Sequence, residues 1–402
     1  MTTLAVAPPE LRALLAAADQ CVLCGLCSAQ CPTYALYQTE AESPRGRITL
    51  IQALLKGQIS PDDSTRASLG HCLSCRRCEA QCPSGVPYGR LIDGVKAWVP
   101  DATTHRAHRF TALLTRSAGL RGWIRGILGA LPNALLPRWG KVIKRYARAP
   151  SSTTRAAAVA PVALFTGCIT ELADQAAIAA ALHLLTALEV DVACPPSHVC
   201  CGAIALHAGQ RDPWLHAAHT NARAFGPALT DVLSLTPGCT ASLREYALVA
   251  QPEVQALAAK TRDVGAYLLA HPRWSQLQFH TLPKRVGVHV PCAQRNVLKD
   301  SHSTHALLKS IPGITLVMLP ELPACCGAAG TQMLHQPQQA QALRTPLLEF
   351  MRTQTLDIVV STNIGCALHL TEGLIAHKMN TQVMHPLTLL ADLLISPRDP
   401  RV

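Results

Sequence analysis

The sequence predicts a multidomain protein of mixed α+β and α/β class. A mostly helical N-terminal module is followed by a duplicated α/β domain with largely parallel sheets. Two repeats lead to this prediction: a run of four cysteines occurs twice near the N-terminus, and a different set of cysteine marks occurs twice in the C-terminal part. A length of 402 residues is enough for two or three such domains.

Both N-terminal runs have the spacing C-x2-C-x2-C-x3-C-P. They consist of Cys21, Cys24, Cys27 and Cys31 before Pro32, and of Cys72, Cys75, Cys78 and Cys82 before Pro83. Bacterial ferredoxins hold [4Fe–4S] clusters with this spacing. Three cysteines in steps of three wrap a loop around three corners of a cubane. The fourth lies too far along the chain to close the same cube, and in two-cluster ferredoxins it binds the other cluster.

The predicted ligand sets are therefore crossed between the two runs. The first cluster takes Cys21, Cys24, Cys27 and Cys82, and the second takes Cys72, Cys75, Cys78 and Cys31. Structural zinc is the alternative, since paired C-x2-C knuckles form tetrahedral sites. The third cysteine in step and the fourth before proline argue against zinc. Disulfides are disfavoured too, because 17 cysteines in 402 residues are fewer than a disulfide scaffold needs.

Composition narrows the class of protein further. Hydrophobic residues make up 49% of the chain and aromatic residues 4%, so we expect cores of Ala, Leu, Val and Ile. No uncharged apolar run of about 18 residues occurs, which predicts no transmembrane helix. The segment 1–20 does not have the pattern of a secretory signal, which favours the reducing cytosol. A net charge of +11 suits anionic partners, but no nucleic-acid-binding motif is present, and we expect no nucleic acid.

Helical patterns divide the N-terminal part. We expect an amphipathic helix over residues 1–20 and another over 48–55, within a cluster-binding module of residues 1–95. Residues 96–158 are predicted to form a basic helical connector and linker. In the connector, arginines and lysines alternate with Trp and Leu, which is typical of a segment at a membrane surface. The other interpretation, a linker that packs on its own chain, is favoured by Pro132 and Pro137.

The remainder of the chain is an internal duplication. Its marks are Cys168, Cys200-Cys201-Gly202 and Cys239 in one half and Cys292, Cys325-Cys326-Gly327 and Cys366 in the other. The offsets are 292 − 168 = 124, 325 − 200 = 125 and 366 − 239 = 127. Apolar β-rich runs precede the marks and helical patterns follow them, which predicts α/β domains over 159–282 and 283–402.

Each half brings four cysteines to the carboxyl ends of its strands, where sites form in parallel sheets. The quartets Cys168, Cys200, Cys201, Cys239 and Cys292, Cys325, Cys326, Cys366 are therefore candidates for further cluster ligands. The alternative is that they are small buried hydrophobic residues that fill loop corners. That alternative is favoured for Cys194, whose counterpart in the repeat is Leu319. His198, His207 and His289 are expected to be core or surface residues.

In its order of motifs, the chain resembles the iron–sulfur subunits with cysteine-rich CCG domains, above all the glycolate oxidase iron–sulfur subunits. The segments that carry the resemblance are 31–34 (CPTY), 43–48 (SPRGRI), 72–78 (CLSCRRC), 82–85 (CPSG), 325–331 (CCGAAGT) and 363–366 (NIGC). It covers nearly the whole chain. It implies two [4Fe–4S] clusters, an electron-transfer role with no catalytic residue, FAD-binding partner subunits and a quinone or other respiratory acceptor. It also implies a cytoplasmic location, peripheral on the inner face of the membrane.

Two features separate this chain from related classes. Units of the heterodisulfide reductase type end in C-x2-C, whereas here Cys239 is followed by Ser242 and Cys366 by His369 in that place. This counts against disulfide reduction and leaves either a four-cysteine cluster, with His369 near the second site, or no cluster. The chain contains no G-x-G-x-x-G fingerprint, so no flavin is expected on it. The remaining alternatives are the equivalent subunit of a glycerol-3-phosphate or lactate dehydrogenase, a heterodisulfide-reductase-like enzyme and a zinc-stabilised binding protein.

Overall fold

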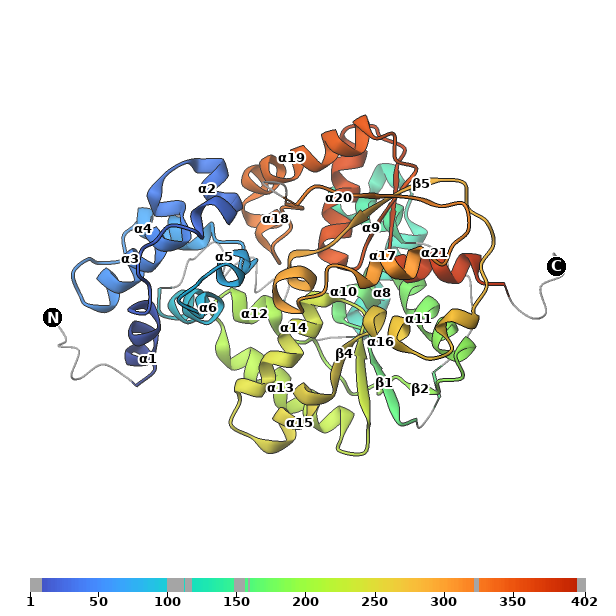
Figure 1. Cartoon of the computed structure of the whole chain (residues 1–402), viewed down its shortest axis with the longest axis horizontal. Helices are drawn as coiled ribbons and strands as arrows, with labels where there is room; N and C mark the ends of the chain where they lie inside the picture. Colours follow the sequence, from blue (N-terminus) through green and yellow to red (C-terminus); the bar gives the residue numbers. More distant parts are fainter. Residues whose placement is uncertain are drawn as a thin grey trace. The chain divides into compact units, whose positions relative to one another are not determined.

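The computed structural model describes residues 9–99, 112, 118–147, 156–157, 160–321 and 325–395. These residues form two compact units, and neither is one continuous stretch of sequence. The first unit combines Met1–Thr111, Ile204–Trp214 and Pro320–Pro346. The second combines Ala112–Ala203, Leu215–Leu319 and Leu347–Val402. Figure 1 shows the chain with its elements labelled.

The first unit is built from short helices, and residues 9–99 contain no strand. Its elements are α1 (Pro9–Ala18), η2 (Ser28–Gln30), α2 (Pro32–Tyr37), η3 (Glu40–Glu42), α3 (Pro44–Leu55), α4 (Asp63–Gly70), α5 (Arg77–Ala80), α6 (Tyr88–Trp98) and α18 (Gln332–His335). Aliphatic residues of α1, α3, α4 and α6 form one core, to which Cys72 and Cys78 also belong. The predicted cluster ligands are thus part of the packing of this unit.

The two helices predicted in this region are present. The helix predicted over 1–20 is confirmed as Pro9–Ala18, and residues 1–8 lie outside the described residues. The helix predicted over 48–55 is longer and begins at Pro44, because Ser43 caps it by accepting a hydrogen bond from the Gly46 amide at 2.9 Å. Proline suits the first helical position because it lacks an amide hydrogen that would need a partner.

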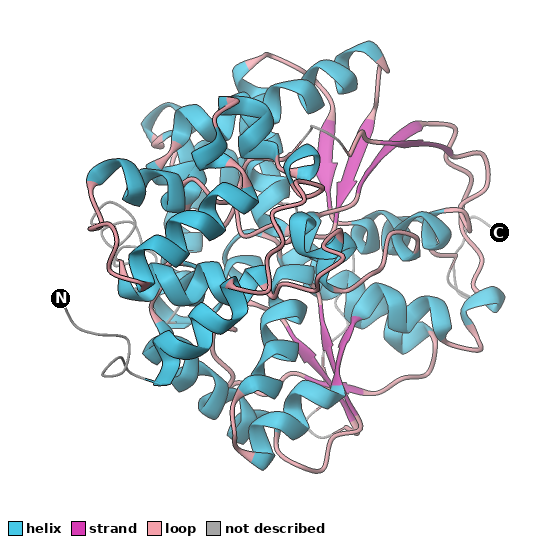
Figure 2. Cartoon of the chain, turned by 60° about the vertical axis from the view of Figure 1, so that its left-hand side comes forward, coloured by secondary structure: helices cyan, strands magenta, loops and turns pink. Residues whose placement is uncertain are grey.

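The second unit contains two four-stranded sheets with the same topology, β2-β1-β3-β4 and β6-β5-β7-β8, and every pairing is parallel. The strands are β1 (Val162–Phe165), β2 (Val192–Ala193), β3 (Asp231–Ser234), β4 (Thr261–Asp263), β5 (Arg285–His289), β6 (Thr315–Met318), β7 (Ile358–Ser361) and β8 (Gln382–Met384). Figure 2 shows the sheets as two separate groups of arrows. The predicted duplication and parallel sheets are confirmed.

Helices cover both sheets of this unit. They are α8 (Ala118–Ala130), η4 (Asn133–Leu135), α9 (Arg138–Tyr146), α10 (Cys168–Ala173), α11 (Gln175–Ala187), α14 (Pro237–Glu245), η5 (Tyr246–Leu248), α15 (Pro252–Lys260), α16 (Val264–Ala270), η6 (Trp274–Gln276), the π-helical turn η7 (Ala293–Val297), α17 (Ser303–Leu308), α20 (Ile364–Ala376) and α21 (Pro386–Leu393). Helix α11 of the first half packs on α21 of the second, and residues of both sheets share one hydrophobic core. Three further helices, α12 (Ala203–His207), α13 (Arg211–Phe225) and α19 (Pro337–Thr353), cross unit boundaries in the sequence.

The predicted connector begins too early, because residues 96–98 are still part of α6. The helices described within the rest of it are α8, η4 and α9. These helices pack against α10 and α20 of the second unit, which matches the interpretation of a linker that packs on its own chain. Helix α8 ends before Pro132, and Pro137 immediately precedes α9. The rest of the connector and linker prediction, at 100–111, 113–117, 148–155 and 158–159, lies outside the described residues.

Candidate metal centres

The first candidate centre is a partly open cavity in the first unit. Its wall includes all four cysteines of the first predicted ligand set, Cys21, Cys24, Cys27 and Cys82. Cys24 is exposed, and the side chains beside it, Val22 and Leu23, are 69% and 52% exposed. This centre therefore lies close to the surface of the unit.

The second candidate centre is another partly open cavity in the same unit. It is lined by all four cysteines of the second predicted set, Cys31, Cys72, Cys75 and Cys78. Cys72 and Cys78 are buried, and Cys31 and Cys75 are half-buried. The four cysteines of each predicted set thus line one cavity, and Cys78 also lines the first.

Backbone geometry around the two cavities fits an anionic cluster. The residue before the second cysteine of each run has a positive φ, 54° at Leu23 and 49° at Ser74, and so does the residue after it, 83° at Gly25 and 57° at Arg76. Alternation of right- and left-handed residues turns successive amide groups toward one concave side, which binds anions. Outside glycine this conformation costs about 1–3 kcal/mol and persists where the surroundings require it. A thiolate-bound cluster would account for that strain.

The pKa values of the cysteine thiols also suit a metal cluster in these cavities. Burial raises the pKa of Cys75 to about 12, and the neighbouring Cys31, Cys325 and Cys72 thiols add to the increase. Burial also raises the pKa of Cys78 and of Cys27. Several thiolates could not be charged together here without a cation to neutralise them. Bound iron would supply that charge, because a thiol that coordinates a metal is deprotonated.

The two cavities share part of their wall. Pro44, Cys78 and Tyr88 line both of them. Pro44 is the first residue of α3, so this helix begins between the two centres. One side chain near its start faces each cavity: Arg45 lines the first and Arg47 lines the second.

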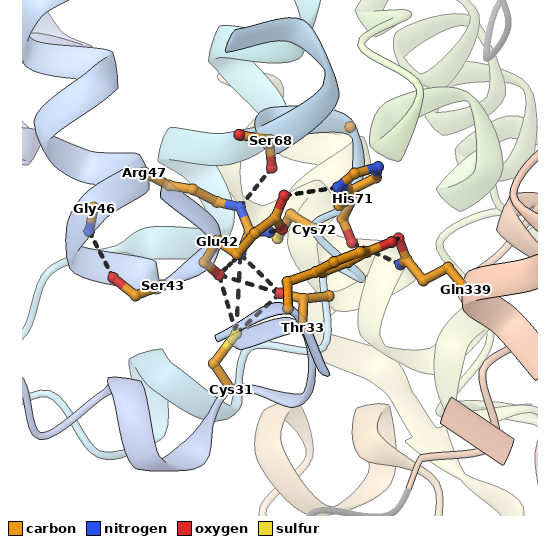
Figure 3. A network of polar contacts seen from close by, with 12 residues as sticks. Cys31, Thr33, Glu42, Ser43, Gly46, Arg47, Ser68, His71, Cys72 and Gln339 are labelled. Atoms are coloured by element: carbon orange, nitrogen blue, oxygen red, sulfur yellow. Dashed lines mark hydrogen bonds and ion pairs between the residues drawn. The ribbon is translucent and has the colours of Figure 1, made fainter. Parts of the chain in front are cut away.

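Arg47 is the centre of a buried polar network beside Cys31 (Figure 3). Its side chain is 1% exposed. Nη1 lies 3.9 Å from the Cys31 Sγ and donates hydrogen bonds to Thr33 Oγ1 at 3.0 Å and to the Glu42 carbonyl at 2.6 Å. Nη2 pairs with the Glu42 carboxylate, and Nε donates to the Ser68 carbonyl at 2.6 Å. All three nitrogens of the guanidinium group therefore have partners.

The network continues from Glu42 to the loop that carries Cys72. The Glu42 carboxylate lies 2.7 Å from the His71 Nδ1, and the Tyr37 ring stacks on the His71 ring with a centroid distance of 4.9 Å. Gln339 Nε2 donates to the His71 carbonyl at 3.0 Å. Gln332 Nε2 donates to the carbonyls of Gly70 at 2.7 Å and Cys72 at 3.0 Å. Residues from the second CCG segment thus hold the second cysteine loop in place.

The third candidate centre is in the second unit and consists of the first CCG quartet. Cys168 Sγ and Cys200 Sγ are 3.4 Å apart, and the Gly202 amide donates to Cys200 Sγ at 3.4 Å. The hydrogen bond from Cys168 lowers the pKa of Cys200, and the same bond raises the pKa of Cys168. Contact with both Cys200 and Cys239 raises the pKa of Cys201. The structure therefore brings all four predicted thiols together.

A buried ion pair lies beside this quartet. Arg121 of α8 is 5% exposed and pairs with Glu171. Its charge favours the thiolate form of Cys200 and partly opposes the rise in the pKa of Cys168. Burial alone would raise the pKa of Glu171, but hydrogen bonds from His198, Thr166 and Arg121 outweigh it and lower that pKa to about 2. The sequence shows Arg121 only as one of several connector arginines. His198, expected to be a core or surface residue, is part of this network.

The second CCG quartet is divided between the two units. Cys292 and Cys366 belong to the second unit, and Cys325 and Cys326 belong to the first. In the first unit, the Cys325 thiol lies near enough to Cys75 to raise the pKa of Cys75. A hydrogen bond with Cys326 and burial raise the pKa of Cys325 itself, and Arg77 only partly opposes that increase. Arg77 is 9% exposed and donates to the Glu321 carbonyl at 2.7 Å.

The positions where related units carry a final cysteine are filled differently here. Ser242 is 3% exposed and donates to the Cys201 carbonyl at 2.9 Å. His369 is 2% exposed, and its ring lies 6.4 Å from the Trp139 ring. Within the described ranges, no helix is both long and apolar enough to cross a bilayer.

Comparison with known families agrees with this geometry. Residues 17–86 match the family model of the 4Fe-4S dicluster domain, and residues 162–244 and 286–371 each match that of the cysteine-rich CCG domain. The probable glycolate oxidase iron–sulfur subunit of Bacillus subtilis (strain 168) is 30% identical, over 93% of both chains. The chain belongs to the family of glycolate oxidase iron–sulfur subunits.

Two further proteins are similar to this chain. The glycolate oxidase iron–sulfur subunit of Escherichia coli (strain K12) is 30% identical over 88% of this chain and 89% of its own length. Lactate utilization protein A of Geobacillus thermodenitrificans (strain NG80-2) is 26% identical over 52% of this chain and 89% of its own length. Membership of this family supports an iron–sulfur electron-transfer subunit of an oxidoreductase that works in a complex with other subunits.

Proposed function

We propose that this chain is the electron-transfer subunit of a multi-subunit glycolate oxidase. It accepts electrons from an FAD-binding partner that oxidises glycolate to glyoxylate, and it passes them to a quinone or another respiratory acceptor. The observation that carries the proposal is the pair of four-thiol cavities with a common wall. Family membership supplies the substrate of the complex.

The proposed ligand sets follow the linings of the two cavities. Cys21, Cys24, Cys27 and Cys82 would hold the first [4Fe–4S] cluster, and Cys31, Cys72, Cys75 and Cys78 the second. When bound, each cluster takes and returns one electron, whereas oxidation of glycolate releases two. Two adjacent one-electron sites therefore suit a two-electron flavin donor. Because Cys78 and Tyr88 line both cavities, electrons would have only a short distance to cross between the sites.

The first test separates this relay from a catalytic chain. The purified chain alone should oxidise no glycolate, and activity should require the flavin-binding partner. In the assembled complex, Cys24→Ser or Cys75→Ser should each remove one cluster signal from the electron paramagnetic resonance (EPR) spectrum. Each should also block electron flow to the acceptor, while glycolate still reduces the flavin. Cys194→Ser is the matched control because this thiol lines neither cavity. Normal electron flow in both ligand variants would reject the relay.

The first CCG quartet is the best-supported place for an additional cluster. Four converging thiols and the buried Arg121 nearby suit an anionic metal group. About eight irons per chain would account for two cubanes alone, whereas about twelve would require a further cluster. Cys201→Ala should lower iron by about four per chain if the quartet holds that cluster. Unchanged iron would identify these cysteines as packing residues.

Two other functions remain as alternatives. The same relay could serve a lactate- or glycerol-3-phosphate-oxidising partner, and similarity to lactate utilization protein A favours testing lactate first. Glycolate, lactate and glycerol-3-phosphate should therefore be compared as electron donors to the purified complex. Disulfide reduction of the heterodisulfide reductase kind is disfavoured, because Ser242 and His369 stand where a further thiol would be needed.

We also propose peripheral contact with the inner face of the cytoplasmic membrane through the connector. Trp123 and Leu135 are 66% and 70% exposed, and the connector also presents the exposed cations Arg125, Lys141 and Arg145. Exposed Trp and Leu with basic residues suit an anionic lipid surface. Flotation with vesicles that contain anionic lipid should retain the chain. Trp123→Ser with Leu135→Ser should release it, and equal retention of that variant would reject this surface.

A further inference from the structure

We propose that Arg47 sets the order of the two clusters, so that an electron shared between them rests on the one held by Cys31, Cys72, Cys75 and Cys78. This inference relies on the two ligand sets of the proposed function. It concerns a side chain that is not itself a ligand. The step is the transfer of one electron from the reduced first cluster to the oxidised second cluster, with no bond made or broken and no proton moved.

The first argument is the position of the charge. Arg47 lines the second cavity, with Nη1 at 3.9 Å from Cys31 Sγ, while Nη2 pairs with the Glu42 carboxylate (Figure 3). The positive end of the ion pair is thus directed toward the proposed cluster. A cluster with four thiolates becomes more negative when it is reduced, and a cation in contact with a ligand sulfur favours that state.

The second argument is burial. Arg47 is 1% exposed and its partner Glu42 is 6% exposed, so water screens their fields little. A guanidinium group stays protonated in proteins, so this buried charge is permanent.

Hydrogen bonding adds to the effect at the same cavity. Thr33 Oγ1 lies 3.2 Å from Cys31 Sγ, and the Tyr88 hydroxyl donates to Cys72 Sγ at 3.8 Å. Hydrogen bonds to ligand sulfurs and charge near the cluster are among the features that set the potentials of iron–sulfur centres. Arg47 also positions Thr33 by its bond of 3.0 Å to Oγ1.

Arg45 provides a contrast within the same helical turn. It lines the first cavity, but its side chain is 36% exposed and pairs at 2.7 Å with Glu40, which is 51% exposed. Ion pairs at such exposure are worth little, because solvent screens them. Two arginines two residues apart therefore face the two centres in different dielectric surroundings, and only the buried one exerts a strong field.

The experiment is an EPR-monitored redox titration of the anaerobically purified full chain. Cys75→Ser first identifies which signal belongs to the second cluster. The measured quantity is the equilibrium ratio of electrons on the second cluster to electrons on the first. Glu42→Gln removes the compensating negative charge and should raise this ratio at least tenfold. The double variant, Arg47→Met with Glu42→Gln, removes both charges and should lower the ratio at least tenfold relative to Glu42→Gln alone. A tenfold change corresponds to about 59 mV for one electron.

Two further variants complete the test. Arg47→Lys keeps the charge, and its ratio should stay within about threefold of the parent. If the double variant loses iron, this variant still shows whether the charge or the packing of Arg47 matters. Arg45→Met, the matched control, should also change the ratio less than about threefold. The proposal is overturned if Glu42→Gln and the double variant leave the ratio unchanged, or if Arg45→Met changes it as much as they do. Absence of two cluster signals in the parent would instead reject the proposed function.

Discussion

Replacement of Gly46 by alanine is expected to disturb both cluster cavities at once. A Cβ atom at this position would lie 1.9 Å from the Glu40 carbonyl oxygen and 2.7 Å from its carbon, and both are backbone atoms. An ordinary contact needs about 3.4 Å, so the start of α3 and the turn η3 would have to separate by roughly 3.4 − 1.9 = 1.5 Å.

The magnitude follows from two opposing effects. Overpacking against backbone costs about 3 kcal/mol, at the upper end of the usual range. Alanine in a helix regains about 1 kcal/mol relative to glycine. The net loss is about 2 kcal/mol, or roughly 4–8 °C in the unfolding midpoint of a domain of about 150 residues. Iron per chain should fall as well, because Pro44 and Arg47 move with the start of the helix.

The assay is thermal unfolding by circular dichroism at one fixed scan rate, together with iron content. Gly126→Ala is the matched control: it makes the same substitution inside α8, where a new Cβ would meet no atom within 4 Å. It should stabilise the protein by about 0.5–1 kcal/mol. If Gly46→Ala retained the iron and the midpoint of the parent, the close approach of η3 to α3 would be wrong.

Three further predictions concern stability and the second cluster. Burial raises the pKa of Asp263 to about 6, so its contribution to stability is complete below pH 4 and is lost as the pH rises through 6. Asp263→Asn should therefore be more stable than the parent at pH 8 by up to about 3 kcal/mol in urea unfolding, and equal to it below pH 4. Leu91→Ala, at a fully buried site in α6, should cost about 2–5 kcal/mol, whereas Leu248→Ala at a 53% exposed site should cost under about 0.5 kcal/mol; equal losses would contradict the packing. Gln332→Leu removes the hydrogen bond from Gln332 to the Cys72 carbonyl, so the visible absorbance of the variant should bleach faster in air than that of the parent. An unchanged bleaching rate would mean that Gln332 does not stabilise the second cysteine loop.

The sequence predicts the parts of this protein that depend on spacing along the chain. The spacing of the two cysteine runs predicts two crossed sets of thiols, and the four thiols of each set line one cavity. Cysteine marks at one offset, each after a β-rich run, predict two copies of a parallel sheet. Strands β1 and β5 are two of the apolar β-rich runs that precede these cysteines.

The environment of the sites could not be predicted in the same way. Arg45 and Arg47 are alike in sequence, and only the packing of α3 makes one exposed and the other buried. Arg121 stands among many basic residues, and its role beside the first quartet depends on how α8 packs on α10. The sequence also does not predict that the segments 204–214 and 320–346 belong to the first unit. Hydrophobic periodicity predicts a helix or strand, but not which other elements it packs against.

The late origin of one of these segments has a consequence for how the protein is made. The glutamine that holds the carbonyl of His71 is Gln339, which lies 268 residues farther along the chain. At about 5–20 residues per second, a ribosome needs roughly 13–54 s to synthesise the residues between them. Throughout that time the nascent second cysteine loop is without its clamp. Iron delivered during synthesis would therefore meet a loop that this hydrogen bond does not yet hold, whereas iron delivered after release would meet a loop that it does hold.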